Sequence, residues 1–377
     1  MPLVHVAIVG AGIIGLATAL ELRSRGATIT LIDPAPGLGA SHAAAGMLAP
    51  SAETTWGQGK LNALLSASAR AYPEFIDAVQ LASGVRPAFI QNSTLVVAAQ
   101  PADREALVEL IDLQDSLGLP VKRLLGTEAR ALEPALAANI AGAVLCPDDH
   151  QVDPRSLITI LLEALKENLL VEPVAGLLRV GERTIGVRTG SGTNIHADQV
   201  LLATGMGQIP GVPRLPIRPV YGEILRVQGS AEHPLLRHTV RGIVHRRPVY
   251  LVPRADGSLV LGASSREDGD ARVNLGEVTT LLENARRLVP GIVDTTLNEV
   301  IARARPTTFD DIPLLGRLDE GLVISTGYSR HGVLLTPLGA RLGAQLLLGE
   351  PFDAQLAGIV DPHRLSSQDF GIARTHL

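Results

Sequence analysis

The sequence predicts a mixed α/β (α+β) fold in which a Rossmann-type, dinucleotide-binding domain stands beside a second domain built on a mixed sheet. Three observations predict it. A glycine-rich turn between a strand and a helix opens the chain, short β-type runs fill residues 220–263, and the last hundred residues return to buried strand and helix. A chain of 377 residues is also long for a single hydrophobic core, so two domains are the better expectation.

The first twenty residues carry the strongest motif. Four apolar residues, Val6-Ala-Ile-Val, precede the turn, and apolar residues then recur at helical spacing. Such a turn needs one glycine to bend, one to let the backbone approach a pyrophosphate and one to pack the helix closely. The helix N-terminus adds unpaired N–H groups. We therefore predict a pyrophosphate-binding turn made of Gly10, Ala11, Gly12, Ile13, Ile14 and Gly15.

An acidic residue completes this motif. Asp33 follows a second short strand over residues 28–32, at the distance where a carboxylate accepts hydrogen bonds from both hydroxyls of an adenosine ribose. A phosphate on that ribose would be repelled. This stretch alone leaves open whether the ligand is a nicotinamide or a flavin cofactor.

Composition narrows the function classes. Hydrophobic residues make up 46% of the chain and charged residues 19%, and the formal net charge of −5 gives no basic face for nucleic acid. The single cysteine cannot form an internal disulfide. The apolar N-terminus lacks a basic region before it, and no uninterrupted apolar run reaches the ~18 residues of a membrane span. We therefore expect a cytoplasmic protein without nucleic-acid or membrane partners.

The first half of the chain is predicted to alternate small-residue loops, helices and strands. Residues 40–50 are mostly small, so their backbone can lie flat against a planar ligand. Asp153 followed by Pro154 is a helix N-cap with proline at the first helical position. The remaining predicted elements are helices at 60–81, 101–117, 128–134 and 154–168, and a strand at 89–98.

The second half is predicted to be richer in strands. Asp256-Gly257 between two β-type runs is a hairpin marker. The predicted strands are 170–174, 177–187 as a hairpin, 199–205, 220–227, 249–254, 258–263, 297–303 and 321–327, and the predicted helices are 277–288 and 336–348. No internal repeat or low-complexity linker separates the dinucleotide-binding segments from the strand-rich segments, so we expect discontinuous domains. The first, which binds the dinucleotide, comprises 1–85, 142–215 and 300–377, and the second, which binds the substrate, comprises 86–141 and 216–299.

Taken in order, the motifs resemble those of the D-amino-acid oxidase group of flavoproteins, and within it the glycine oxidases of thiamine biosynthesis. The resemblance covers essentially the whole chain. It is carried by Gly10 to Gly15, Ala43-Ala-Ala-Gly-Met-Leu48, Val152-Asp-Pro154, Pro219-Val-Tyr-Gly-Glu223, Tyr250-Leu-Val-Pro-Arg254, Ala304-Arg305-Pro306 and Ser329-Arg-His-Gly-Val-Leu-Leu335. It implies FAD, bound without a covalent link, in a discontinuous Rossmann-type domain.

The resemblance also implies the cofactor-binding residues. Asp33, where the family usually has glutamate, would bind the ribose, and Val174 would hold the adenine through its backbone. The flavin would be lined by Ser41, His42, Ala44, Ala45, Gly46, Met47 and Leu48, the phosphates would pass Ala203, Thr204 and Gly205, and the pyrimidine end would rest on Arg330, His331, Gly332, Val333, Leu334 and Leu335.

The substrate side follows from chemistry as well as from the resemblance. An amino-acid carboxylate in an apolar pocket needs a fixed partner, and arginine suits it because its planar fork pairs with both oxygens and keeps its charge. Arg305 matches the family's carboxylate-binding arginine, and the Tyr250 hydroxyl is the second donor. Arg330 would assist through its backbone carbonyl or its side chain, and Met47 would also contact the substrate.

The implied reaction is the oxidative deamination of glycine or another small amine such as sarcosine or D-alanine. Hydride passes to the flavin N5, O2 is the acceptor, and the products are a 2-oxo acid (glyoxylate from glycine), ammonia and hydrogen peroxide. The place of this reaction would be thiamine thiazole biosynthesis. The flavin performs the chemistry, so no acid or base motif is required, and we predict no metal site.

Departures from the family keep other hypotheses open. Sarcosine oxidases attach flavin to a cysteine near the arginine strand, but residues 306–316 contain none, and Ser265 stands where glycine oxidases often have methionine. The main alternative is a D-amino-acid or D-proline-type dehydrogenase that passes electrons to a quinone or a partner protein. A flavin-binding subunit without turnover and a nicotinamide dehydrogenase are further options. The family suggests a homo-oligomer.

Overall fold

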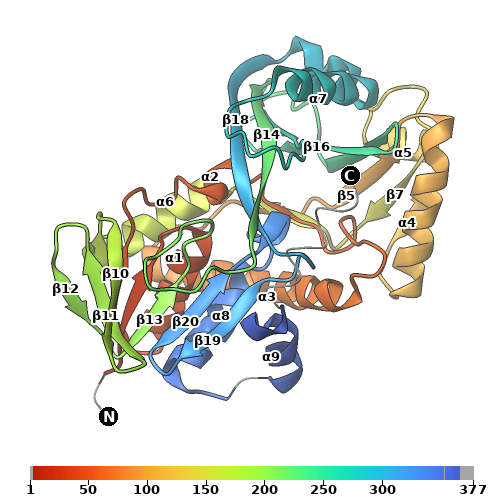
Figure 1. Cartoon of the computed structure of the whole chain (residues 1–377). Helices are drawn as coiled ribbons and strands as arrows, with labels where there is room; N and C mark the ends of the chain where they lie inside the picture. Colours follow the sequence, from red (N-terminus) through yellow and green to blue (C-terminus); the bar gives the residue numbers. More distant parts are fainter. Residues whose placement is uncertain (1–2, 352, 366–377) are drawn as a thin grey trace.

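A six-stranded sheet forms the first half of the fold in the computed structural model, which describes residues 3–351 and 353–365 (Figure 1). Its strands are parallel except for the edge strand β19, which pairs antiparallel with β20. In spatial order they are β19 (Leu314–Asp319), β20 (Leu322–Thr326), β13 (Gln199–Leu202), β1 (His5–Val9), β2 (Thr28–Ile32) and β9 (Leu169–Leu170).

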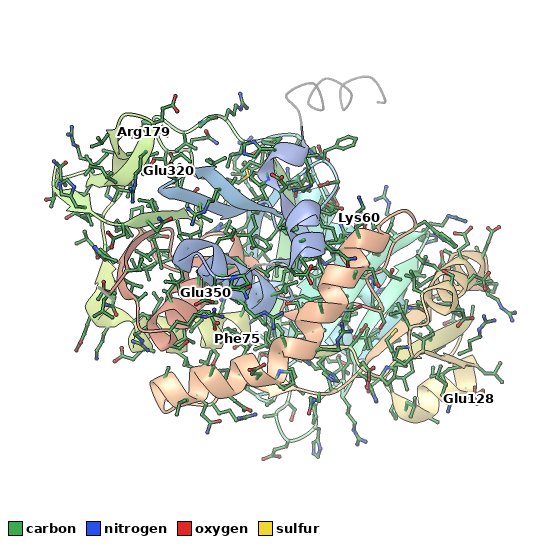
Figure 2. All side chains as sticks on the ribbon, turned by 90° about the horizontal axis from the view of Figure 1, so that it is seen from below. Lys60, Phe75, Glu128, Arg179, Glu320 and Glu350 are labelled. Carbon is green, nitrogen blue, oxygen red and sulfur yellow. The ribbon has the colours of Figure 1, made fainter. Side chains whose placement is uncertain are left out.

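Helices cover one face of this sheet, and a small antiparallel sheet covers the other. One hydrophobic core joins the sheet to α1 (Ile13–Ser24), α3 (Gly59–Ser83), α6 (Pro154–Ala164) and α8 (Thr336–Leu348). A second core joins its opposite face to β10 (Val174–Val180), β11 (Arg183–Thr189) and β12 (Asn194–His196). Figure 2 shows α3 crossing the lower face past Lys60 and Phe75, with Glu350 beside it.

An eight-stranded mixed sheet forms the second half. Only the β15–β5 pair in it is parallel. Its strands, in spatial order, are β18 (Thr296–Thr307), β14 (Arg218–Gln228), β17 (Ser258–Gly262), β16 (Arg247–Pro253), β15 (Thr239–Val244), β5 (Thr94–Ala98), β7 (Gly142–Cys146) and β6 (Lys122–Leu124). The mixed α/β class predicted from the sequence is confirmed.

Shorter elements complete the fold. The helices α4 (Arg104–Ser116), α5 (Gly126–Leu132) and α7 (Leu275–Leu288) accompany the eight-stranded sheet, and α9 (Ala354–Val360) follows α8. A three-stranded sheet joins β3 (Met47–Leu48), β8 (His150–Val152) and β4 (Phe89–Ile90). The remaining segments are α2 (Ala40–Ala43) and the short 3-10 helices Pro101–Asp103, Lys166–Asn168, Pro290–Asp294, Ser329–His331 and Pro362–Arg364.

Two long strands link the halves. β14 and β18 pair along their whole length and run from the eight-stranded sheet down to the six-stranded one (Figure 1). At the lower end of β18, Thr307 forms a β-bridge with Tyr328, which follows β20. Side chains on one face of this ribbon therefore meet the carboxyl ends of the parallel strands.

Most local predictions hold, and two are wrong. The Asp153 carboxylate accepts from the Arg155 amide at 3.2 Å as the N-cap of α6, and Asp256-Gly257 joins β16 to β17. The single strand predicted over 89–98 is two strands in different sheets, because Ser93 has a φ of 60° and turns the chain between them. The strand predicted over 170–174 is also wrong. β9 ends at Leu170 and β10 begins only at Val174, because Pro173 between them has no N–H to donate to a strand ladder. The elements that were not predicted are α2, α9, β3, β6, β7, β8, β12, β15 and β19.

The division into two discontinuous domains stays a prediction. The boundary expected at residue 300 falls inside β18, and residues 366–377 of the last segment lie outside the described part of the chain. Within 3–351 and 353–365, no helix combines the length and apolar character needed to cross a membrane.

Candidate active site

A cavity of about 790 Å³ lies where the two sheets meet. The pyrophosphate-binding turn and α2 line one end of it. The ribbon of β14 and β18, with β16, lines the other. The sequence-predicted residues that line it are Gly12, Ile13, Ile14, Asp33, Ser41, Ala44, Ala45, Gly46, Met47, Ala203, Thr204, Gly205, Tyr250, Arg305, Arg330, Gly332 and Val333.

The three glycines of the first turn are glycine for different structural reasons. A Cβ on Gly15 would lie 1.9 Å from the Gly10 carbonyl oxygen, and one on Gly10, whose φ is +106°, would lie 2.4 Å from the Ala203 oxygen. A Cβ on Gly12 would meet only the Ser41 hydroxyl, at 3.5 Å. Gly10 and Gly15 are therefore required by packing, whereas Gly12 leaves an opening toward the cavity, as a phosphate cradle requires.

Asp33 ends β2 beside this turn. Its carboxylate accepts from the Ala11 amide at 2.6 Å and from the Ala35 amide at 2.7 Å, one on each oxygen. These bonds fix the carboxylate against the turn, and each oxygen keeps a second lone pair for a ribose hydroxyl. The turn, its opening and this acid together fit the adenosine diphosphate half of FAD.

The small-residue segment is held from behind by arginines. The His42 carbonyl accepts from Arg155 Nε at 2.9 Å, and the Ala45 carbonyl accepts from Arg254. Gly46 has a φ of +79°, and a Cβ there would lie 2.0 Å from the Val152 oxygen. The backbone of residues 42–46 is thus fixed along the cavity, as a bed for a planar ring requires.

Other predicted cofactor residues lie behind the cavity wall. Leu48, Leu334 and Leu335 are buried in the core, and Val174 packs against the core beneath β10. The His331 imidazole is 1% exposed and turns toward Glu53. The predicted residues that do not line the cavity are Gly10, Ala11, Gly15, His42, Leu48, Val174, His331, Leu334 and Leu335. Their contacts with a cofactor stay predictions.

Arg305 and Tyr250 both line the other end of the cavity, where two glycines make room for them. A Cβ on Gly222 of β14 would lie 2.2 Å from Arg305 Nη2, and one on Gly262 of β17 would lie 2.4 Å from the Tyr250 hydroxyl. Burial raises the pKa of Tyr250 to about 12, although the Arg305 charge acts to lower it. The tyrosine therefore keeps its proton and is a hydrogen-bond donor at neutral pH.

The cavity arginines differ in their partners. Arg218 pairs with Glu267 at 3.0 Å, Arg241 with Glu53 at 2.6 Å, and Arg330 with Asp311 at 2.9 Å. Among the residues that the structure describes, no carboxylate lies within ion-pair distance of Arg303 or Arg305, and Arg303 is the more exposed of the two. Arg305 is thus a half-buried cation whose charge is left for a ligand.

Sequence reasoning missed a buried ion cluster beside Tyr250. Glu53 lines the cavity, pairs with Arg241 and lies 3.4 Å from His331 Nδ1. Burial alone would raise the pKa of Glu53, but the Arg241 charge and the neighbouring His331 imidazole outweigh it and hold the pKa well below its usual range. The available signal was Arg241 itself, an arginine inside the apolar run Thr239–Val244.

Three further residues that the sequence analysis linked to the substrate also line the cavity. Ser265, where the family often has methionine, lines the cavity, so this wall is short. Met47 also lines it. The Arg330 guanidinium is engaged by Asp311, which favours its backbone carbonyl for a role toward the substrate.

A model of the protein family described as "FAD dependent oxidoreductase" (DAO) matches residues 5–346. The chain belongs to this family. The FAD-dependent oxidoreductases bind FAD, and the turn, the acid and the flavin bed described above fit that cofactor.

Relatives within the family include oxidases of small amino acids. The chain is 31% identical over 354 residues to a glycine oxidase of Geobacillus kaustophilus, across 91% of this chain and 92% of that one. The crystal structure of glycine oxidase from the same organism superposes with a TM-score of 0.86 at 30% identity, covering 96% of this chain and all of that one.

Two further similarities mark the range of the family. The chain is 32% identical over 360 residues to the bifunctional protein ThiO/ThiG of Trichormus variabilis, across 93% of this chain and 54% of that protein, so it spans about half of the length of this relative. The iminodiacetate oxidase structure from Chelativorans sp. BNC1 superposes with a TM-score of 0.83 at 27% identity, covering 94% of this chain and 98% of that one.

Proposed function

We propose that this chain catalyses the FAD-dependent oxidative deamination of glycine, with sarcosine and D-alanine as further candidate substrates and O2 as the electron acceptor. The products from glycine are glyoxylate, ammonia and hydrogen peroxide. One observation supports the proposal above the others: Arg305 lies half-buried in the cavity beside the Tyr250 hydroxyl, and no ion pair in the described part of the chain engages it. The glycine oxidases among its relatives support the substrate class.

Arg305 and Tyr250 both bind the substrate carboxylate. The guanidinium pairs with both oxygens of the carboxylate, and the tyrosine hydroxyl donates a further hydrogen bond. The backbone carbonyl of Arg330 accepts from the amine. These contacts fix the α-carbon at the flavin bed, where position is worth most to the rate. FAD bound at these residues would supply the hydride acceptor for the α C–H bond, with O2 as the final electron acceptor.

The residues proposed to hold FAD fall into three groups. The pyrophosphate group is the turn from Gly10 to Gly15 with Ala203, Thr204 and Gly205, and the ribose and adenine are assigned to Asp33 and Val174. The flavin is assigned to residues 41–48 and 330–335. Gly12, Asp33 and Gly46 carry the strongest structural support, because they provide, respectively, an opening, a fixed carboxylate and a position that admits only glycine.

The wider setting is also part of the proposal. The likeness to the bifunctional ThiO/ThiG protein supports a place in thiamine thiazole biosynthesis. A cytoplasmic location and a homo-oligomeric state stay predictions. Light scattering on the purified protein measures the oligomeric state directly.

An anaerobic absorbance titration tests the proposed function. The FAD-loaded protein receives glycine, sarcosine, D-alanine and D-proline in turn, and we expect glycine to bleach the flavin bands. Readmitted air should restore them and yield hydrogen peroxide in stoichiometric amount. Bleaching that air does not reverse would indicate a dehydrogenase with another acceptor. A spectrum that no amino acid changes would overturn the proposal.

A further inference from the structure

The loop behind Arg305 determines where its guanidinium stands. Arg305 Nη1 donates to the Ser264 carbonyl oxygen at 3.2 Å, across the space that Gly222 leaves. Ser264 is the second residue of the connection between β17 and α7, residues 263–274. Since no carboxylate in the described part of the chain restrains Arg305, its orientation depends on how firmly this loop holds Ser264.

Glu223 fixes Ser264 through two hydrogen bonds. The Ser264 hydroxyl accepts from the Glu223 amide at 2.8 Å and donates to the Glu223 carboxylate. Glu223 is fully buried and Ser264 is 7% exposed, so water does not compete for these bonds. Glu223 follows Gly222 on β14, and because strand residues alternate in direction, it lies on the face away from the cavity. It does not line the cavity.

The same carboxylate clamps the rest of the loop. It accepts from Arg266 Nε at 3.0 Å, Arg266 Nη2 at 2.8 Å and the Asn274 amide at 3.1 Å. Arg266 Nη2 also donates to the carbonyls of Asp270 and Arg272, at 3.1 and 2.9 Å. A backbone bridge between Tyr221 and Arg266 closes the loop onto β14. One buried ion pair therefore holds both ends of residues 264–274.

The charge of this pair is costly to bury. Taking an ion pair out of water is expensive, and apolar residues of similar volume often stabilise a fold as well or better. Burial would raise the pKa of Glu223, but the hydrogen bonds from Arg266, Ser264 and Asn274 lower it overall, so the carboxylate is ionised. A buried network satisfied at every atom is rigid, and rigidity is what an arginine anchor needs.

We propose that Glu223 and Arg266 form a positioning pair for substrate binding: they fix Ser264, whose carbonyl orients the Arg305 guanidinium toward the substrate carboxylate. Neither residue is proposed to touch the substrate or the cofactor. This inference rests on the proposed function only in taking a carboxylate as the ligand of Arg305.

Acetate binding tests the pair without requiring turnover. The dissociation constant of acetate is measured by isothermal titration calorimetry on FAD-loaded protein with the Glu223→Gln substitution. The matched control is Glu133→Gln, because Glu133 is also buried, at 2% exposure, and accepts from the Arg237 and His238 amides at 2.9 Å, away from the cavity. We expect acetate to bind about tenfold more weakly to the first variant and within twofold of the parent to the second.

A double-mutant cycle separates positioning from a general loss of stability. In an Arg305→Ala background, Glu223→Gln should weaken acetate binding no further, because the group that it positions is gone. With glycine, Glu223→Gln should raise KM more than it lowers kcat. A pair with a purely structural role would lower the melting temperature of both glutamate variants and leave both acetate constants unchanged, which would overturn the inference.

A second variant covers a failure of Glu223→Gln to fold. Ser264→Ala keeps the carbonyl but removes the hydroxyl that Glu223 holds, and it should weaken acetate binding severalfold. An unchanged constant in this variant would also overturn the inference. If Arg305→Ala itself leaves acetate binding unchanged, the carboxylate role of Arg305 fails instead, so the two failures are distinguishable.

Discussion

The two ends of the cavity are built by different means. The end proposed to hold the nucleotide, called the nucleotide end, consists of backbone: three glycines, a row of alanines and amides, with Asp33 held by two of those amides. The end proposed to hold the substrate, called the substrate end, consists of side chains from separate strands, with Arg305 on β18, Tyr250 on β16 and Arg241 on β15. At the nucleotide end, we expect an added side-chain atom to abolish or weaken cofactor binding, because the cofactor would lie against the backbone. At the substrate end, we expect truncation of a side chain to weaken substrate binding in proportion to the interaction that is lost. Three predictions test this difference, and a fourth concerns a buried carboxylate outside the cavity.

The largest expected effect is at the nucleotide end. Gly15→Ala places a Cβ 1.9 Å from the Gly10 carbonyl oxygen, and we expect it to destabilise the fold by at least ~3 kcal/mol and to abolish FAD binding. Gly12→Ala is the control, because its Cβ meets nothing closer than 3.5 Å. That variant should fold normally yet bind FAD more weakly. Thermal unfolding and the flavin-to-protein absorbance ratio measure both, and equal stability of the two variants would contradict the packing argument.

The next effect is at the substrate end. Arg305→Ala should lower kcat/KM for glycine by ~10²–10³-fold while FAD stays bound, since truncating one partner of a buried charge pair costs ~2–5 kcal/mol. Arg218→Ala is the matched control, because Arg218 also lines the cavity but already pairs with Glu267. It should change kcat/KM less than fivefold. Steady-state peroxide assays measure kcat/KM for both variants. Similar losses of kcat/KM in both variants would show that Arg305 does not bind the substrate carboxylate.

A smaller effect is expected from the tyrosine hydroxyl. Tyr250→Phe should raise the KM for glycine about tenfold, the value of one hydrogen bond to a charged group. Tyr328→Phe is its control, because the Tyr328 hydroxyl bonds Ser325 at 2.8 Å and is buried. That variant should lose stability and keep its KM. The same peroxide assay applies, and a KM that does not respond to Tyr250→Phe would confine substrate binding to the arginine.

The fourth prediction is a pH dependence of stability. Asp149 is buried and accepts from the Ser51 and Ala52 amides, and burial raises its pKa to about 7 against those bonds. The folded protein then binds a proton that the unfolded chain has released above pH ~4, so this residue lowers stability as the pH rises from ~4 to ~7, by up to ~1.4 kcal/mol per pH unit. The advantage of the parent over Asp149→Asn should shrink across that window in urea unfolding. A constant difference would mean that Asp149 titrates normally.

The nucleotide end was predictable from the sequence because its determinants are adjacent. Gly10, Gly12 and Gly15 lie in one turn, and Asp33 lies one strand later, so spacing alone identifies them. Short-range dihedral and capping rules likewise predicted the Asp153 N-cap and the Asp256-Gly257 hairpin. The family resemblance supplied Arg305 and Tyr250, which spacing could not.

The rest could not be predicted because strand register decides it. Glu53 and Arg241 are separated by a large part of the chain, and only the pairing of β15 with β16 brings Arg241 beside Tyr250. Glu223 belonged to a motif, but its hydrogen bonds to Ser264 and Arg266 required the observed path of residues 263–274. Ser93 broke a strand that alternation predicted as continuous, because its positive φ leaves no trace in the pattern.

Gly222 and Gly262 set a direction for any redesign of the substrate end. Arg305 and Tyr250 have room because these two positions have no side chain. Since glycine is the smallest residue, no substitution at either position can enlarge this space. Substitution at either position can therefore only exclude larger amino acids or displace the anchors. We expect a broader substrate range from shortening Met47, which also lines the cavity, and a narrower range from added bulk at Ser265.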